Sequence, residues 1–496
     1  MLRRTGVGVV GALAWMLSAG ACSSDPASQA SDAGAADTGP AADSGPCTAT
    51  GRPYEDGCFG IDGTGVFVNA KAAAGGDGTK GKPFNKLQDA LNKGGRIYVC
   101  EGEYTGSVTL TAASPASTVF GGLSCDGFGF AGKSVVLKGA VDVPALLLDG
   151  TKVALAFSDI EIAAPDAVGK EADGSGKSSV AVFGRNASAT TFTRCTLRAG
   201  KGAPGAEGAA GTGYAAAGRS GTELAGVGNG LCSCSAKGTG GASTSTTGGA
   251  PGGVAGQTGG TGQSSPAAPK DGARSGKGGD ADCTAGINGS NGIAQAGGAP
   301  AGSPGTLQAD RWASTPGGSG EDGLPGQGGG GGGGAAGGRG GWGACGGCGG
   351  RGGSGGGGGG ASLGLASYQS MFTVNASTFR TGGGGGGGKG GAGEAGAGGG
   401  LGEPGPNTCG GAAAGNGAGG SGGAGGSGGP SVGVVFLGTA PTVNAPKFEL
   451  GAGGAGGDPG AAGSAASPST PSYPGIAGST GSKGRAGDKL DSLAAQ

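Results

Sequence analysis

The chain has 496 residues, and its 136 glycines are about four times the usual share of roughly 7 %. Its 25 prolines are too few for collagen, in which proline and hydroxyproline supply roughly 15–20 % of the residues. The 32 basic and 33 acidic residues leave a net charge of −1, which excludes the positive field that drives nucleic-acid binding. The chain contains no histidine, which excludes Ser-His-Asp and Cys-His catalysis and every histidine-ligated metal site.

The first 21 residues have the features of an export signal. Two arginines precede an uncharged apolar run over residues 7–17, which is too short to span a membrane. Small residues then lead to Cys22, and this ending resembles the lipobox of bacterial lipoproteins, in which the cysteine is lipidated. With Ser24 in place of aspartate, the resemblance implies an outer-membrane or cell-surface location, with the periplasm as second choice. Cleavage near Ala21 without a lipid is the alternative.

Two short segments follow the predicted anchor. Residues 22–46 consist almost entirely of Ser, Asp, Ala, Gly and Pro, and cannot bury enough apolar surface to offset chain entropy. We therefore expect a flexible stalk. Cys47 and Cys58 bracket a small loop over residues 47–62, which one disulfide could close in an oxidising compartment.

Residues 63–199 predict a solenoid of short β-strands. A helical turn following Pro83, with Phe84, Leu87 and Leu91 on one face, is expected to end at two glycines, and a β-rich run follows over 96–104. The pattern GxDGTxxxPFxxLQxAL…IYVxxGxY resembles the N-terminal cap of right-handed parallel β-helix proteins, the pectate-lyase-like superfold. That resemblance implies a helix that plugs the end of the solenoid. Further strands are predicted at 108–110, 135–137, 145–148, 153–157 and 160–162.

One rung of the solenoid recurs after long interruptions, beginning at Ser179, Ser362 and Ser431. The second and third copies occupy residues 362–381 and 431–450. Stacking of the copies predicts one column of Thr191, Thr373 and Thr442 and another of Thr193, Asn375 and Asn444. An outer column of Arg198, Arg380 and Glu449 predicts a contact between Arg380 and Glu449.

Glycine-rich sequence fills residues 200–361, 382–430 and 451–496. Glycine there keeps a three-residue phase, without a break from Gly384 to Gly405, which predicts polyproline II helices. We expect an all-β, right-handed parallel β-helix with these insertions bundled beside it. Disorder is the alternative, because polyglycine loses much conformational entropy on folding. In composition the tracts also resemble the glycine-rich surface proteins called PGRS-like.

Of the 12 cysteines, 11 remain if Cys22 carries a lipid, so at least one is unpaired within the chain. The disulfide candidates are Cys47, Cys58, Cys100, Cys125, Cys232, Cys234, Cys283, Cys345, Cys348 and Cys409. The alternatives are a redox pair or a zinc site of Cys232, Cys234, Cys345 and Cys348. The Cys-x-Cys spacing of Cys232 and Cys234 is poor for zinc, which favours disulfides.

Few residues point to catalysis. Asp159 and Glu161 alternate along one predicted strand, and such a pair could bind calcium or act as acid and base on a sugar. A solvated strand face is the commoner origin of this pattern. We therefore expect a non-catalytic envelope lipoprotein with a structural, adhesive or glycan- and matrix-binding role and no cofactor. Its expected partners are the membrane, through the lipid, and a polysaccharide or an envelope protein. The alternatives are a polysaccharide lyase or hydrolase and an ice-binding protein.

Overall fold

The computed structural model describes residues 59–213, 232–233, 242–243, 287–326, 344, 346–402, 410–466 and 489–494. All of them belong to the larger of two compact units, Thr48–Gln496. The predicted signal peptide, stalk and lipid site at Cys22 lie outside the described residues. So do the cysteines Cys47, Cys58, Cys234, Cys283, Cys345 and Cys409. The described part contains no helix long and apolar enough to cross a membrane.

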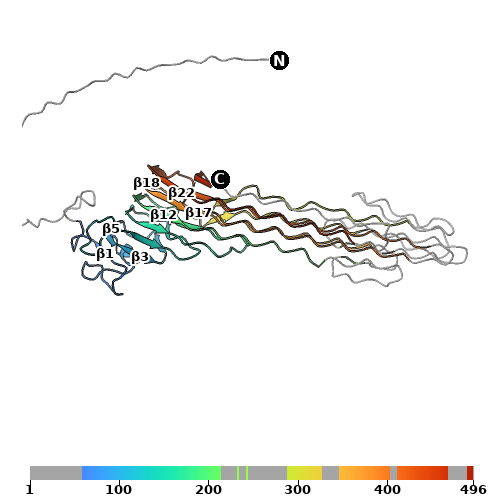
Figure 1. The fold of residues 1–496 in the computed structure, drawn as a ribbon, viewed down its shortest axis with the longest axis horizontal. Helices are drawn as coiled ribbons and strands as arrows, with labels where there is room; N and C mark the ends of the chain where they lie inside the picture. The colour runs from blue at the N-terminus through green and yellow to red at the C-terminus, as the bar shows by residue number, and fades with distance from the viewer. Residues whose placement is uncertain are drawn as a thin grey trace, which may run out of the picture. The chain divides into compact units, whose positions relative to one another are not determined.

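Three parallel sheets form the folded body (Figure 1). The first sheet contains β1 (Val66–Val68), β2 (Gly95–Cys100), β5 (Ser117–Leu123), β8 (Leu155–Ser158), β11 (Thr190–Thr193), β18 (Phe372–Asn375) and β21 (Thr442–Asn444). The second contains β3 (Gly102–Thr105), β6 (Val135–Lys138), β9 (Glu161–Ala163), β12 (Thr196–Ala199), β19 (Thr378–Thr381) and β22 (Lys447–Leu450). The third contains β4 (Val108–Thr111), β7 (Leu146–Asp149), β10 (Ser179–Arg185), β17 (Ser362–Tyr368), β20 (Ser431–Leu437) and β23 (Lys489–Ala494).

From β2 onward, each circuit of the chain adds one strand to each of the three sheets, apart from two short hairpins. Each new strand pairs in parallel with the strand of the previous circuit. This pattern confirms the predicted parallel β-helix. Alternate side chains point inward, and the interior is apolar, with stacked rings such as Phe157 on Phe192 and Phe379 on Phe448 at 5.3 and 5.1 Å between ring centroids.

A short helix, α1 (Leu87–Lys93), packs Leu87 and Leu91 into the core at the N-terminal end. It begins later than the sequence predicted. Phe84 is extended instead, because its backbone N–H donates to the carbonyl oxygen of Phe67 at 2.9 Å and its carbonyl accepts from Asn69 at 2.8 Å. Pairing with the first strand therefore takes precedence over helix formation at this point. The helix ends at Gly94, which has a φ of 76°.

Every glycine-rich insertion leaves the solenoid at the same corner, between the second and third sheets. The first runs from the end of β12 to the start of β17, the next from β19 to β20, and the last from β22 to β23. Two of the elements inside these insertions that were not predicted pack on the third sheet. One is β23, which pairs with β20, and the other is the hairpin of β15 (Gly305–Leu307) and β16 (Trp312–Ser314). That hairpin packs Leu307 and Trp312 on the apolar outer face of the third sheet. A shorter hairpin joins β13 (Cys232–Ser233) and β14 (Ala242–Ser243).

The described glycine tracts are tied together by backbone hydrogen bonds that recur every third residue. The N–H groups of Gly384, Gly387, Gly390 and Gly393 donate to the carbonyl oxygens of Ala452, Ala455, Asp458 and Ala461 at 2.9–3.0 Å. Residues 201–211, 317–326, 347–360 and 415–429 make the same kind of contact with their neighbours. A three-residue repeat is that of a polyproline II helix. Figure 1 draws the tracts as long extended segments alongside one another.

Candidate functional site

A groove of about 230 Å³ lies where the first sheet turns into the second. The side chains that give it chemical character are those of Phe130, Lys133, Asp159, Glu161, Arg194 and Thr196. They come from consecutive circuits: a loop after β5, the corner after β8, the start of β9, and the corner and strand after β11. The stacking of the solenoid therefore assembles the groove from residues far apart in the sequence.

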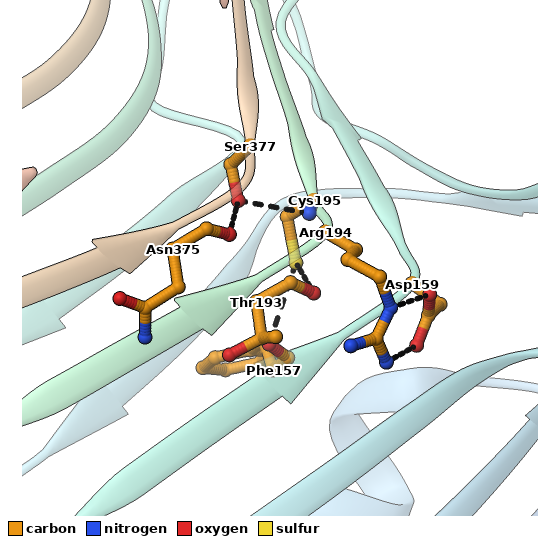
Figure 2. A network of polar contacts seen from close by, with 7 residues as sticks. All are labelled: Phe157, Asp159, Thr193, Arg194, Cys195, Asn375 and Ser377. Carbon is orange, nitrogen blue, oxygen red and sulfur yellow. Dashed lines mark hydrogen bonds and ion pairs between the residues drawn. The ribbon is translucent and has the colours of Figure 1, made fainter. Parts of the chain in front are cut away.

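Asp159 and Arg194 form a two-pronged ion pair in this groove (Figure 2). The Nε and Nη2 atoms of Arg194 donate to the two carboxylate oxygens of Asp159 at 2.8 and 2.7 Å. The Arg194 side chain is 46 % exposed and that of Asp159 only 13 %, so the guanidinium is the outer member. The prediction that Asp159 lies on a strand is wrong. With a φ of 56°, it forms the corner between β8 and β9.

Glu161, the other predicted carboxylate, does lie on a strand and lines the same groove. Its Oε1 accepts a hydrogen bond from Nε of Arg198, one circuit further on, at 2.5 Å. Both carboxylates are thus engaged by arginines, which are permanent cations and present fixed N–H donors. The arrangement holds the carboxylates in place and sets charged hydrogen-bonding groups of both signs along the groove.

Phe130 supplies an apolar wall to the groove. It is 44 % exposed, whereas Phe128, two residues earlier, is buried in a cluster of aromatic rings. The loop is held because the N–H groups of Ala131 and Lys133 both donate to the carbonyl oxygen of Gly122, at 3.0 and 3.1 Å. A Cβ on Gly122 would lie 2.6 Å from the Phe130 ring, so only glycine lets the ring lie there. Nothing in the sequence separates Phe130 from the core aromatics, so the sequence does not predict its exposure.

The corner behind the groove contains a buried thiol (Figure 2). Cys195 is the free cysteine among the described residues, and its Sγ lies 3.4 Å from the Phe157 carbonyl oxygen. Its N–H donates to Oγ of Ser377 at 3.0 Å, and that hydroxyl donates to the carbonyl oxygen of Asn375 at 2.8 Å. Burial raises the pKa of the Cys195 thiol to about 12, so it stays protonated at neutral pH. This cysteine was not among the disulfide candidates.

The residues of the predicted ladder lie in register. Thr191, Thr373 and Thr442 pair directly across three strands, as do Thr193, Asn375 and Asn444. The amide Nδ2 of Asn444 donates to Oδ1 of Asn375 at 2.9 Å. In the outer column, Nε of Arg380 donates to Oε2 of Glu449 at 2.6 Å. Hydrogen bonds from Lys447 and then Arg380 lower the pKa of Glu449.

Among the cysteine candidates, Cys100 and Cys125 form a disulfide that ties the end of β2 to the loop after β5. Cys348 is also disulfide-bonded. The alternative zinc site includes Cys234 and Cys345, which lie outside the described residues. Within the described ranges, no group of three or more His, Cys, Asp or Glu side chains is placed to hold a metal ion.

A second hollow, of about 700 Å³, lies beside α1 and is lined largely by glycine, with three charged side chains at its rim. Two of these support the surrounding loops. Oδ1 of Asp62 accepts from the N–H of Lys80 at 3.1 Å, and Nζ of Lys93 donates to the carbonyl oxygen of Asp77 at 2.7 Å. The groove at Phe130 therefore carries more of the chemistry that a ligand could use.

Comparison of the chain with protein-family models, with curated proteins and with solved structures finds no match. Its function is therefore inferred from the groove and the fold that builds it.

Proposed function

We propose that this chain is a non-catalytic protein of the bacterial envelope, anchored by a lipid on Cys22, whose solenoid binds a polysaccharide in the groove at Phe130. The observation that supports this is the exposed Phe130 ring beside the Asp159–Arg194 pair in one groove. An aromatic ring offers a flat apolar surface to the C–H groups of a sugar ring. Guanidinium and carboxylate groups fixed beside it donate to and accept from sugar hydroxyls.

The pairing of the carboxylates supports binding rather than catalysis. Glycoside hydrolysis needs one carboxyl group that gives up a proton and a second that acts as base or nucleophile. Both oxygens of Asp159 accept hydrogen bonds from Arg194, and Glu161 accepts one from Arg198. Each carboxylate is thus held in place by an arginine, which suits a fixed hydrogen-bonding surface for sugar hydroxyls.

A carbohydrate-active enzyme is the second candidate, because Asp159 and Glu161 line the same groove. A lyase or a hydrolase would have to release one of them from its arginine during turnover. Product formation distinguishes this candidate from simple binding.

The structural part of the proposed role belongs to the glycine bundle. Its tracts are joined along their length by backbone hydrogen bonds repeated every three residues. Such a bundle is stiff without an apolar core, which suits a spacer or scaffold in a chain with only 4 % aromatic residues. The same surface of closely packed backbone offers little side-chain chemistry for an enzyme.

A glycan array with the purified full-length protein tests the proposal. We expect retention of one class of polysaccharide, and an affinity about threefold to tenfold lower for Phe130→Ala, since an aromatic contact is worth roughly 0.5–1.5 kcal/mol. Val168→Ala, at an exposed apolar residue outside the groove, is the matched control and should bind normally. Retention of no glycan, or equal binding by the Phe130 variant, contradicts the proposal. New reducing ends or unsaturated products that disappear in Asp159→Asn would establish the enzyme instead.

A further inference from the structure

Two arginines of like charge lie side by side on the outer face of the second sheet. Arg198 of β12 and Arg380 of β19 are direct register partners. Register partners in neighbouring parallel strands are separated by about 4.8 Å. At that distance like charges repel each other unless a group of opposite charge lies between them. Other charged partners in register have opposite signs, such as Arg185 with Asp149 and Arg380 with Glu449.

Each of the two guanidinium groups uses only one nitrogen for its ion pair. Nε of Arg198 donates to Glu161 on one side, and Nε of Arg380 donates to Glu449 on the other. A guanidinium has five N–H groups, so the Nη groups of both side chains are left for another acceptor. The two side chains are 44 % and 45 % exposed, which makes them accessible from solvent.

The charge around the pair also favours an anion. Arg198 contacts Glu161, while Arg380 and Lys447 share Glu449, so three cations meet two carboxylates. An anion placed between the two arginines would neutralise the excess and relieve their repulsion.

We propose that Arg198 and Arg380 form a binding site for a tetrahedral oxyanion, a phosphate or sulfate ester. A carboxylate has only two oxygens, and one guanidinium can bind both of them, as Arg194 does with Asp159. A tetrahedral ester group has three terminal oxygens, which can accept from the Nη groups of two arginines on adjacent strands. Lysine ammonium groups would not offer this planar fork.

The site adjoins the groove, because two residues that line the groove are neighbours of Arg198. Glu161 contacts Arg198, and Thr196 lies two residues before Arg198 on β12. This inference deepens the proposed function: the natural ligand is a glycan that carries phosphate or sulfate groups. It rests on the proposed function for the identity of that ligand. The anion site itself can be tested without any glycan.

Isothermal titration calorimetry with inorganic phosphate, at ionic strength matched with sodium chloride, tests the site in the full-length protein. We expect saturable binding that weakens about tenfold or more in Arg198→Gln and in Arg380→Gln, because each removes charged hydrogen bonds. Arg311→Gln is the matched control, since Arg311 is 44 % exposed, lies beside Asp310 and is far from this pair in the sequence. Its affinity should equal that of the unmodified protein.

Three further measurements keep the test decisive. Circular dichroism checks that the variants fold, and Arg198→Lys, which keeps the charge but loses the fork, should bind phosphate more weakly than the unmodified protein. Glucose 6-phosphate should bind and glucose should not bind at this site; tighter binding of the sugar phosphate than of inorganic phosphate would identify a glycan ester as the source.

Phosphate affinity that is unchanged in both glutamine variants, or no heat beyond that of chloride, would overturn the inference. A protein that binds phosphate but no glycan would contradict the proposed function and leave the anion site intact. A protein that binds glycans through Phe130 but does not bind phosphate would support the proposed function and contradict the anion site.

Discussion

At the corner between the first and second sheets, residues with very different side chains share one backbone conformation. Asp159, Arg194, Ala376 and Ala445 all have a φ between 45° and 56°. A left-handed conformation costs a non-glycine residue roughly 1–2 kcal/mol. At Asp159, Arg194 and Ala376 it lets the backbone N–H donate to the next circuit, as Ala376 donates to the carbonyl oxygen of Asn444 at 2.8 Å. Because two alanines make the same turn, the Asp159–Arg194 pair is not needed for the corner. This supports a role for the pair in ligand binding.

The buried thiol of Cys195 predicts a pH dependence of stability. Burial raises its pKa from 9.0 to about 12, so above pH 9 the unfolded chain releases a proton that the folded chain retains. The unfolded state then binds fewer protons, and the free energy of unfolding falls as pH rises, by up to about 1.4 kcal/mol per pH unit from this group. Cys195→Ala should reduce this slope between pH 9 and pH 10.5 in urea unfolding.

The comparison isolates one group, because the other titrating residues are common to both proteins. Tyr104, whose pKa burial also raises, contributes equally to each curve. The alanine variant loses some packing, which lowers its stability by a similar amount at every pH. Identical slopes for the two proteins above pH 9 would show that the thiol is not protected from titration.

At the level of the element, the glycine tracts predict a sharp difference between neighbouring positions. A Cβ on Gly387 would overlap the carbonyl oxygen of Gly426, whereas a Cβ on Gly386 has only the Ala455 oxygen nearby, at 3.8 Å. Gly387→Ala should therefore lower the free energy of unfolding by about 1–3 kcal/mol. Gly386→Ala should leave it unchanged or raise it by about 0.4–1 kcal/mol, because alanine has less entropy in the unfolded chain.

Thermal unfolding of the two variants measures this difference, and their composition is the same. Equal melting temperatures would mean that the tracts do not pack as tightly as their hydrogen bonds indicate. The three-residue phase of glycine in the sequence already indicates which positions face a neighbour. It does not indicate which tracts are neighbours, since every tract presents the same glycine column.

The stacking of the solenoid rungs could be predicted from the sequence, because it too follows a regular spacing. The candidate site could not be predicted in this way. Ser362 and Ser431 start repeats with equal spacing to their threonine and asparagine positions, and equal spacing fixes the register of stacked strands. The groove depends on a loop whose course is set by two hydrogen bonds to the Gly122 carbonyl. Such a loop has no periodic pattern, so the exposure of Phe130 does not follow from the sequence. The corner of Asp159 recurs in each circuit, but the residues at it, Asp, Arg and Ala, share no type that would mark it.

At the level of the whole molecule, the sequence predicts attachment to a membrane through Cys22. Cys22→Ser should move the exported protein from the membrane fraction to the soluble fraction, because the thiol is the point of lipid attachment and each buried CH₂ contributes about 0.8 kcal/mol. Fractionation, with mass spectrometry of the N-terminal peptide, measures the change. An unmodified protein found in the soluble fraction, with no lipid on that peptide, would contradict the anchor.

The third sheet ends in a strand that returns from the last glycine tract. β23 pairs with β20, so the tail re-enters the solenoid as the earlier insertions do. The sequence did not predict this strand, because its partner lies more than 50 residues away and its own pattern is short. Each excursion into the bundle is therefore closed by a strand on the third sheet, and the bundle and the solenoid are expected to unfold together.

All the insertions leave the solenoid at a single corner, and this restricts how the glycine tracts can change in length. Both ends of an insertion are fixed by strands of the solenoid, and hydrogen bonds recur at every third residue along its tracts. Adding one or two residues to a tract would turn its glycine column away from the neighbour and place side chains against backbone. Three residues restore the column. Lengthening or shortening of the bundle is therefore confined to whole helical turns, at about 3.1 Å for each residue added.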